Sequence, residues 1–247
     1  MSINPIVIIP VRLGSTRLPQ KPLALIEGKP MVEHVWRRAC QADVGPVVVA
    51  TDAEEIAQIV ENLGGQTIMT DPELPSGSDR VYAALTQVDP KKNYDVVINL
   101  QGDLPNIDPA AIRASINPLT SPDVDVATLA AVIKDESELT NPNVVKIAMA
   151  LDAAGQGGKA LYFSRSLIPH GPGPHYHHIG LYAYRREILE RFVTLAPSSL
   201  ELQERLEQLR LLELGVRFGV ELVDQIPVSV DTPEDLERAR AALKIAA

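Results

Sequence analysis

Residues 6–22 read IVIIPVRLGSTRLPQKP, and this stretch joins a strand to an unusually basic loop. Residues 6–9 are all β-branched, which predicts a strand buried on both faces, and Pro10 is expected to end it. The loop that follows carries the cations Arg12, Arg17 and Lys21. Because ligands of open α/β sheets bind at the carboxyl ends of the strands, this loop predicts a site for a polyanion such as a triphosphate. The alternative is a polar surface loop, which explains the turn residues well but explains less well why cations cluster in a chain of net charge −9.

The composition of the 247-residue chain is that of an ordinary globular protein, with 45% hydrophobic and 22% charged residues. Its negative net charge argues against a general nucleic-acid-binding protein, which would carry a basic face. No apolar run approaches the roughly 20 residues of a membrane span, and residues 1–5 do not resemble a signal peptide. We therefore expect a cytoplasmic protein with no membrane or nucleic-acid partner. Cys40 is the only cysteine, so an intrachain disulfide is excluded, and its apolar helical surroundings predict a buried side chain without a chemical role.

Hydrophobic periodicity divides the chain into alternating strands and helices. Strands are predicted at residues 23–26, 47–50, 67–69, 96–100, 124–133, 144–151, 160–164, 179–184 and 217–222. Helices are predicted at residues 31–42, from about 80 to 88, from 198 to 214 and from 232 to 243, with further helices after Asp52 and Asp108. The strands at 124–133 and 144–151 are expected to pair with each other, and the glycines of 152–159 predict a hairpin turn.

Short polar patterns mark where several helices begin. Asp52 is predicted to cap the helix that follows it, since Glu55 stands at the spacing of a capping box, and contact of Asp52 with a ligand is the weaker alternative. Asp108 precedes a proline in the usual N-terminal pattern. Ser198 with Glu201 forms another capping box, and Gly215 is expected to end that helix. On the last helix, Thr232, Pro233 and Asp235 suit the first turn.

A second candidate ligand loop precedes the helix that starts near Arg80. Ser76, Gly77 and Ser78 supply backbone and hydroxyl donors, and Arg80 stands in the first helical turn. A cation is unfavourable near the positive end of the helix dipole, and a bound anion would offset this cost. The alternative is a simple serine or aspartate cap with a solvated Arg80.

Two carboxylates remain after the helix caps are assigned. Asp103 follows the strand at 96–100, and Asp231 follows residues 228–230 without being needed for the cap at Thr232. Two carboxylates at strand ends could share Mg²⁺, which needs few protein ligands when phosphates supply the others. A lone Asp103 that satisfies loop amides is the alternative.

Histidines cluster in the loop before residue 179, at positions 170, 175, 177 and 178. Zinc is disfavoured there, because no HExxH or cysteine partner is present and the loop is rich in glycine and proline. His178 leads directly into a strand and is expected to face a pocket. In the helix after Ser198, Leu202, Leu206, Leu209 and Leu212 are expected to lie along the apolar side, and Glu204, Glu207, Gln208 and Arg210 along the solvated side.

Taken together, these features suit a nucleoside triphosphate with Mg²⁺, although neither a Walker motif nor GxGxxG is present. Five stretches carry a resemblance to a known family: IIPVR with STRLPxKP at 8–22, QGD at 101–103, NPN at 141–143, YFSR at 162–165 and VDTPEDL at 230–236. The chain resembles the 3-deoxy-manno-octulosonate (KDO) cytidylyltransferases over essentially its whole length. Leu104 departs from the family's usual glutamate after QGD, which leaves Asp103 intact but bears on local pocket detail.

The resemblance implies an α/β protein with a three-layer glycosyltransferase-A-like nucleotidyltransferase fold, in which helices flank a mixed, mostly parallel sheet. Residues 1–247 would form a single domain, in which roughly 125–190 contribute sugar-site and dimerisation elements of a homodimer. The implied reaction is CTP + KDO → CMP-KDO + diphosphate for lipopolysaccharide biosynthesis, with Mg²⁺ assisting in-line attack of the anomeric hydroxyl on the α-phosphate.

The resemblance also implies roles for individual residues. Arg12, Lys21, Asp103 and Asp231 would be catalytic, with the two aspartates holding Mg²⁺. The nucleotide would be bound by Arg12, Ser15, Lys21, Ser76, Gly77, Arg80 and Gln101. The sugar acid would be bound by Gln101, Arg165, His178, Tyr182, Glu207 and Gln208, with Arg165 facing its carboxylate.

Three alternatives stay open at this point. The same chemistry could act on a sialic-acid-like sugar, an amino-KDO acid or a sugar phosphate. An NAD-dependent oxidoreductase is disfavoured by the missing glycine fingerprint. A non-catalytic nucleotide-binding module is disfavoured because Lys21 and both aspartates are present.

Overall fold

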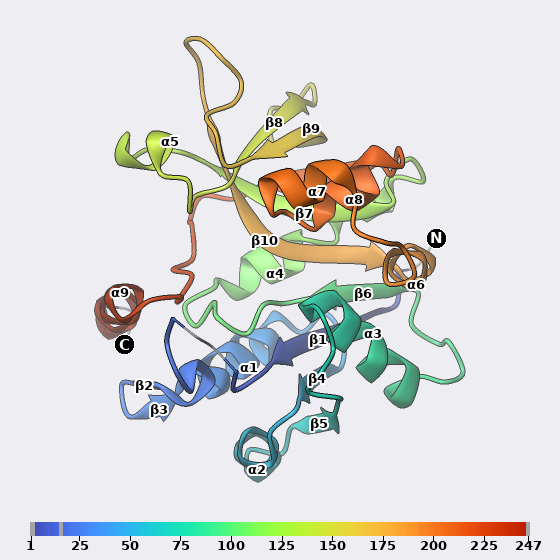
Figure 1. The fold of residues 1–247 in the computed structure, drawn as a ribbon, viewed down its shortest axis with the longest axis vertical. Coiled ribbons are helices and arrows are strands. Elements are labelled where there is room, and N and C mark those ends of the chain that lie inside the picture. The colour runs from blue at the N-terminus through green and yellow to red at the C-terminus, as the bar shows by residue number, and fades with distance from the viewer. Residues whose placement is uncertain (1–2, 15–16, 246–247) are drawn as a thin grey trace. The chain divides into compact units, whose positions relative to one another are not determined.

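The computed structural model describes residues 3–14 and 17–245 (Figure 1). It divides into two compact units. The first unit combines Ser2–Arg113 with Pro227–Ala247, and the second unit is Ala114–Ile226. The expectation that residues 1–247 form a single domain stays a prediction.

The first unit is built on a parallel sheet in the order β5-β4-β1-β6. Its strands are β1 (Pro5–Val11), β4 (Val47–Thr51), β5 (Gln66–Met69) and β6 (Val96–Asn99). Its helices are α1 (Met31–Ala42), α2 (Glu54–Asn62), α3 (Gly77–Val88), α4 (Pro109–Ala114) and α9 (Pro233–Ile245). Residues 6–9 are fully buried at the centre of this sheet, as their β-branched run predicts.

The predicted end of the first strand is wrong, because β1 continues through Pro10 to Val11. The register with β6 ends at Ile8, whereas the register with β4 continues to Val11. One flank of Pro10 therefore has no strand partner, and its missing N–H is tolerated there. The extension places Arg12 directly beyond the carboxyl end of the central strand.

The predicted strand at 23–26 is only partly right. Lys21–Leu23 forms a 3-10 helix, and the strand is reduced to β2 (Leu25–Ile26), which pairs with β3 (Lys29–Pro30). Glu27 and Gly28 both have positive φ, as a tight hairpin turn requires. Cys40 was expected to be buried and is exposed on α1.

The second unit contains strands whose pairing is mostly antiparallel. They are β7 (Val126–Val132), β8 (Lys146–Leu151), β9 (Gly157–Ser164), β10 (Tyr176–Arg185) and β11 (Phe218–Leu222). The order β10-β7-β11-β9-β8 closes on itself through a β10–β8 pairing, and only β7 and β11 run parallel. The predicted pairing of 124–133 with 144–151 is therefore wrong. Strand pairing is mixed, as expected. The strands of the first unit pair in parallel, whereas those of the second unit are mostly antiparallel.

Short helices complete the second unit. They are α5 (Ser137–Thr140), α6 (Arg186–Phe192), α7 (Ser199–Glu204) and α8 (Gln208–Glu213), together with the 3-10 helix Asn117–Thr120. The capping box at Ser198 and Glu201 is confirmed. The predicted continuous helix to 214 is wrong, because Arg205 adopts a left-handed conformation between α7 and α8. The break leaves Leu202 exposed and buries Gln208, against the expected faces of a single helix.

Candidate active site

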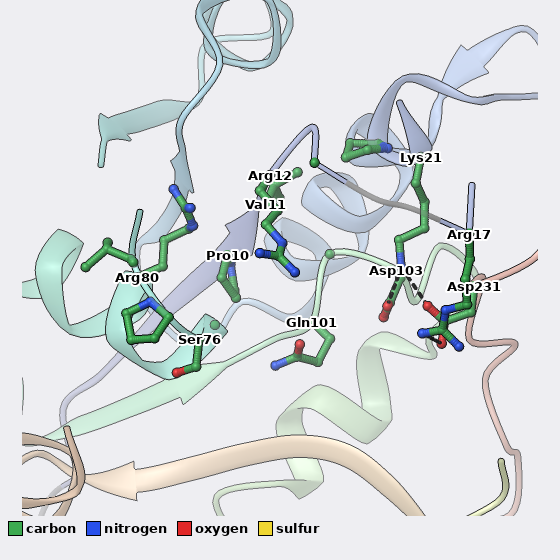
Figure 2. A pocket seen from close by; sticks show the side chains of 16 residues that line it. Pro10, Val11, Arg12, Arg17, Lys21, Ser76, Arg80, Gln101, Asp103 and Asp231 are labelled. Carbon is green, nitrogen blue, oxygen red and sulfur yellow. Dashed lines mark hydrogen bonds and ion pairs between the residues drawn. The ribbon is translucent and has the colours of Figure 1, made fainter. Parts of the chain in front are cut away.

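A pocket of about 330 Å³ lies at the carboxyl ends of β1 and β6, within the first unit (Figure 2). Three sets of residues line it: Arg12, Arg17 and Lys21 of the basic loop, Ser76, Gly77 and Arg80 around the start of α3, and Gln101, Asp103 and Asp231. These are the ligand loops and carboxylates that the sequence predicts, so folding brings them to one place. Ser15, the other predicted nucleotide ligand, lies outside the described residues.

The two predicted carboxylates contact one shared cation. The ammonium of Lys21 donates to Asp103 Oδ2 at 2.8 Å and to Asp231 Oδ1 at 3.1 Å. Arg17 reaches the other oxygen of Asp231 at 3.1 Å. Burial by itself would lower the pKa of Lys21, but the two carboxylates outweigh this and raise the pKa above its usual value.

The chain returns to the pocket through a local anchor at Val230. Its side chain is fully buried in a cluster with Ile26, Met31 and the apolar side of α9. Its backbone N–H donates to the carbonyl of Asp103 at 3.0 Å. Thr232 caps α9 as predicted, through reciprocal hydrogen bonds with Asp235. Asp231 therefore stands beside Asp103. The expectation that Asp231 follows a strand is wrong, because residues 228–230 do not form one.

Gly102 explains why the QGD turn can pass close to β1. A Cβ at this position would lie 2.9 Å from Val11 Cγ2 and 3.0 Å from the carbonyl oxygen of Pro10. A side chain there would force Val11 and the backbone of Pro10 to shift, so glycine allows the turn between Gln101 and Asp103 to pass this close to β1. Gln101 is oriented by its amide, which donates to Asn99 Oδ1 at 2.9 Å.

Ser76 is the N-cap residue of α3, and its hydroxyl accepts a hydrogen bond from the N–H of Asp79. Arg80 lines the pocket, and its side chain is only 3% exposed, which is against the alternative of a solvated arginine. It pairs with Asp52 at 3.2 Å. This carboxylate offsets the unfavourable position of a cation in the first helical turn, so the charge argument for a bound anion at Arg80 no longer holds.

The predicted cap at Asp52 is wrong. Ala53 is the N-cap residue of α2, and the side chain of Thr51 accepts from its N–H at 3.2 Å. Asp52 is directed to Arg80 and to the N–H of Leu13 instead. Its role was missed because a capping spacing is visible in sequence, whereas a partner 28 residues away is not.

The predicted sugar-binding residues other than Gln101 lie in the second unit. His178 is buried, its Nε2 is 3.0 Å from Thr128 Oγ1, and its ring is 5.5 Å from that of Tyr182. Burial, with a small contribution from His177, lowers the pKa of His178 to about 3, so the imidazole is neutral. Burial and the charge of Glu207 raise the pKa of Tyr182 well above its usual value.

Arg165 and Glu207 stand near the break between α7 and α8. The guanidinium of Arg165 donates to the carbonyls of Glu204 and Pro142, both at 2.9 Å. Glu207 precedes α8, and Gln208 is its first, buried residue. The structure thus groups His178 with Tyr182 and Glu207, and ties Arg165 to the α7–α8 turn and to the NPN stretch.

Lys146 is a buried cation that the sequence did not single out. It is 0% exposed, and its ammonium donates to the carbonyls of Asn141, Val144 and Arg165 at 2.6, 2.9 and 3.1 Å. It therefore joins the NPN stretch to the residue proposed to face the sugar carboxylate. A lysine inside a strand pattern gives no sign of such partners, so the signal was absent from the sequence.

Comparison with known proteins identifies the family. The family model for cytidylyltransferases matches residues 6–218. The 3-deoxy-manno-octulosonate cytidylyltransferase of Paramagnetospirillum magneticum is 57% identical over 242 residues, which is 98% of both chains. That of Rhodospirillum rubrum is 57% identical over 240 residues, covering 97% of this chain and 95% of the other. The chain belongs to this family.

A solved member of the cytidylyltransferase family shows the same fold. It is a CMP:2-keto-3-deoxy-manno-octonic acid synthetase complexed with CTP, with 39% identity, a TM-score of 0.88, and coverage of 99% of this chain and 100% of that one. A nucleotidyl transferase from Methanothermobacter thermautotroptrophicus, at 15% identity and a TM-score of 0.64, shares the fold alone. The chain therefore has a mixed α/β nucleotidyltransferase fold.

The described residues also bear on metal binding by this cytidylyltransferase. Among the residues that the structure describes, no three histidine, cysteine, aspartate or glutamate side chains gather into a metal site. Mg²⁺ differs from zinc in needing only one or two carboxylates when phosphates supply further oxygens, so Asp103 and Asp231 fit it.

No helix in the described part of the chain is long and apolar enough to cross a membrane.

Proposed function

We propose that this chain transfers the cytidylyl group of CTP to KDO, forming CMP-KDO and diphosphate for lipopolysaccharide biosynthesis, with the triphosphate in the pocket of the first unit. The observation that carries the proposal is the meeting of Lys21 with Asp103 and Asp231 in a pocket that Arg12 also lines. Near-full-length identity of 57% to KDO cytidylyltransferases supports the choice of reaction.

The chemical task is to bring two anions together. The anomeric hydroxyl of the sugar acid attacks the α-phosphorus in line, and the bond between the α- and β-phosphates breaks. Arg12 and Lys21 are the cations that hold the phosphates and stabilise the negative charge developing on diphosphate. The ammonium of Lys21 can move from the carboxylates to the phosphates, because lysine carries a compact charge on a flexible side chain.

Asp103 and Asp231 are the residues that would hold Mg²⁺. Both are carboxylates, both are partly exposed to the pocket, and both already bind one shared cation. Magnesium bound there would neutralise charge on the α-phosphate and favour the ionised form of the attacking hydroxyl. Arg17, which pairs with Asp231, helps to hold that carboxylate in place.

We assign the sugar acid to residues of the second unit, namely Arg165, His178, Tyr182, Glu207 and Gln208, and we keep Gln101 as a contact that the family resemblance implies. The neutral imidazole of His178 and the protonated Tyr182 suit hydrogen bonding to sugar hydroxyls, because neither adds charge beside an anion. Arg165 supplies the planar donor set that matches a carboxylate.

The finer features of the family extend this proposal. A three-layer glycosyltransferase-A-like arrangement agrees with the parallel sheet and flanking helices of the first unit. A homodimer that uses residues from about 125 to 190 agrees with the exposed Leu151 and Leu161 on the β8–β9 hairpin. We expect the enzyme to work in the cytoplasm.

The decisive experiment is a diphosphate-release assay with CTP, KDO and Mg²⁺, each omitted in turn. Release that requires all three supports the proposal. A panel that replaces KDO by an amino-KDO acid, a sialic acid and a sugar phosphate distinguishes the sugar. Release without any sugar acid, or with none of these acceptors, would contradict the assignment.

A further inference from the structure

Asp52 stands at the carboxyl end of β4, beside the pocket but outside its lining. Its side chain is only 11% exposed. The cap of the following helix does not need it, because Ala53 is the N-cap residue and is held by Thr51. A mostly buried carboxylate that caps no helix calls for another explanation, since its charge is costly unless it is paired.

The two oxygens of Asp52 reach two different ligand loops. Oδ1 accepts from the backbone N–H of Leu13 at 3.4 Å, and Oδ2 accepts from the guanidinium of Arg80 at 3.2 Å. Leu13 lies between Arg12 and Gly14, both of which line the pocket. One carboxylate therefore ties the basic loop after β1 to the first turn of α3.

Arg80 is held from a second side by Thr70. Its other terminal nitrogen donates to the hydroxyl of Thr70, which in turn donates to the carbonyl of Thr51 at 3.1 Å. Figure 2 shows the guanidinium turned away from Asp103 and Asp231, whereas Arg12 faces the pocket. Arg80 thus lines the pocket while its guanidinium is engaged by Asp52 and Thr70.

We infer that Asp52 is a positioning residue of the nucleotide site, holding the backbone beside Arg12 and the first turn of α3 in the spacing that a triphosphate requires. The inference rests on the proposed function only in taking this pocket as the CTP site. Asp52 does not touch the nucleotide; it acts through Leu13 and Arg80. Small displacements of binding groups weaken an interaction steeply, so losing this link reduces CTP affinity.

Charge and position give opposite signs, which makes the inference testable. A negative charge near a triphosphate repels it, so removal of Asp52 for purely electrostatic reasons would tighten CTP binding. Removal of a positioning group weakens CTP binding instead. The direction of the change therefore separates the two roles.

The test compares Asp52→Asn with wild type and with Glu55→Gln, an exposed residue of α2 whose substitution makes the same change in charge. Calorimetric titration with CTP and Mg²⁺ gives affinity, and diphosphate release gives the KM for CTP and for KDO. We expect Asp52→Asn to weaken CTP binding about tenfold and to leave the KM for KDO within about twofold. Glu55→Gln is expected to match wild type.

Thr70→Val provides a second route if Asp52→Asn does not fold. It removes the hydroxyl that holds Arg80 without changing charge, and is expected to weaken CTP binding about threefold, with Thr70→Ser restoring it. Unchanged or tighter CTP binding in folded Asp52→Asn overturns the inference. A parallel rise in both KM values, which a general structural defect would produce, overturns it as well. Failure of the wild-type enzyme to bind CTP would instead refute the proposed function.

Discussion

The ammonium of Lys21 lies 2.8 Å from the carboxylate of Asp103, which joins two loops that are 82 residues apart in the chain. The same ammonium reaches Asp231, 210 residues away. Lys21 therefore offsets part of the negative charge of the two carboxylates that we assign to Mg²⁺. A phosphate that attracts Lys21 would release this pair for the metal, so nucleotide and metal binding are expected to be coupled.

Replacement of Lys21 by methionine is expected to reduce turnover roughly 100-fold, because a charge that stabilises the leaving diphosphate is lost. In the absence of nucleotide, the same variant is expected to bind Mn²⁺ more tightly than wild type, since no ammonium competes for the carboxylates. Electron paramagnetic resonance of free and bound Mn²⁺ measures this directly.

Lys29→Met is the control for Lys21, because Lys29 is an exposed lysine of β3 in the same unit. It is expected to change neither turnover nor Mn²⁺ affinity. Weaker Mn²⁺ binding by Lys21→Met in the absence of CTP would contradict the competition between ammonium and metal.

Asp103→Asn and Asp231→Asn are each expected to lower turnover by about 100-fold or more, because each removes a negative charge that binds Mg²⁺. Asparagine has nearly the same shape as aspartate, so the protein is expected to stay folded. Diphosphate release gives the rate, and circular dichroism checks the fold. Asp43→Asn is a matched control, since Asp43 is exposed and its left-handed backbone suits asparagine. Full turnover by either folded active-site variant would eliminate the mechanism.

Because His178 is buried in its neutral form, we expect the free energy of unfolding to fall in acid. Its pKa is about 3 in the folded protein and 6.5 in the unfolded chain, so between these values the unfolded state binds more protons. Stability is then fully present above pH 6.5 and falls as the pH drops toward 3. The cost for this one group is roughly 2 kcal/mol at about pH 5.

The test for His178 is urea unfolding at about pH 7.5 and at about pH 5, in wild type and His178→Gln. We expect the variant to lose less stability than wild type between the two conditions. His170→Gln, in an exposed loop, is expected to keep the wild-type dependence. Equal pH dependence in His178→Gln and wild type would show that the imidazole is not buried in its neutral form.

Lys146→Met is expected to destabilise the protein by about 3 kcal/mol, because the three carbonyls that its ammonium satisfies lose their donor. Burial lowers the pKa of Lys146. The charge of Arg165 also lowers it, and the charge of Glu138 raises it by less than the total lowering. The KM for KDO is also expected to rise, since Arg165 loses part of its support. Urea unfolding measures the first effect. Lys159→Met, at an exposed position of β9, is the control, and an unfolding free energy equal to wild type in Lys146→Met would refute the assigned role.

Local patterns predicted the elements whose hydrogen bonds close within a few residues. Helix α1 has the predicted bounds of 31–42, and the caps at Ser198 and Thr232 form as expected. The helix after Ser198 could not be predicted in full, because its leucine spacing continues through Arg205 while the backbone there turns left-handed. Periodicity describes which side chains are apolar, and it does not report a break in the backbone.

The pairing of side chains was predictable only where residue chemistry left few choices. Asp103 and Asp231 remained after the caps were assigned, and they do meet in one pocket. Asp52 had a plausible local partner and takes a distant one, since Thr51 satisfies the helix start and the buried Arg80 requires a counter-charge. The order of strands in the second unit was also beyond reach, because strand pairing depends on packing of the whole unit.

By itself, the sequence determined the central β-branched strand, the basic loop and the supply of carboxylates, because each follows from the conformational or chemical preference of adjacent residues. Only the tertiary structure decided which charge meets which: Lys21 with Asp103 and Asp231, and Asp52 with Leu13 and Arg80. The physical reason is that an ion pair depends on distance in space and on burial, and neither is written in the spacing of residues along the chain.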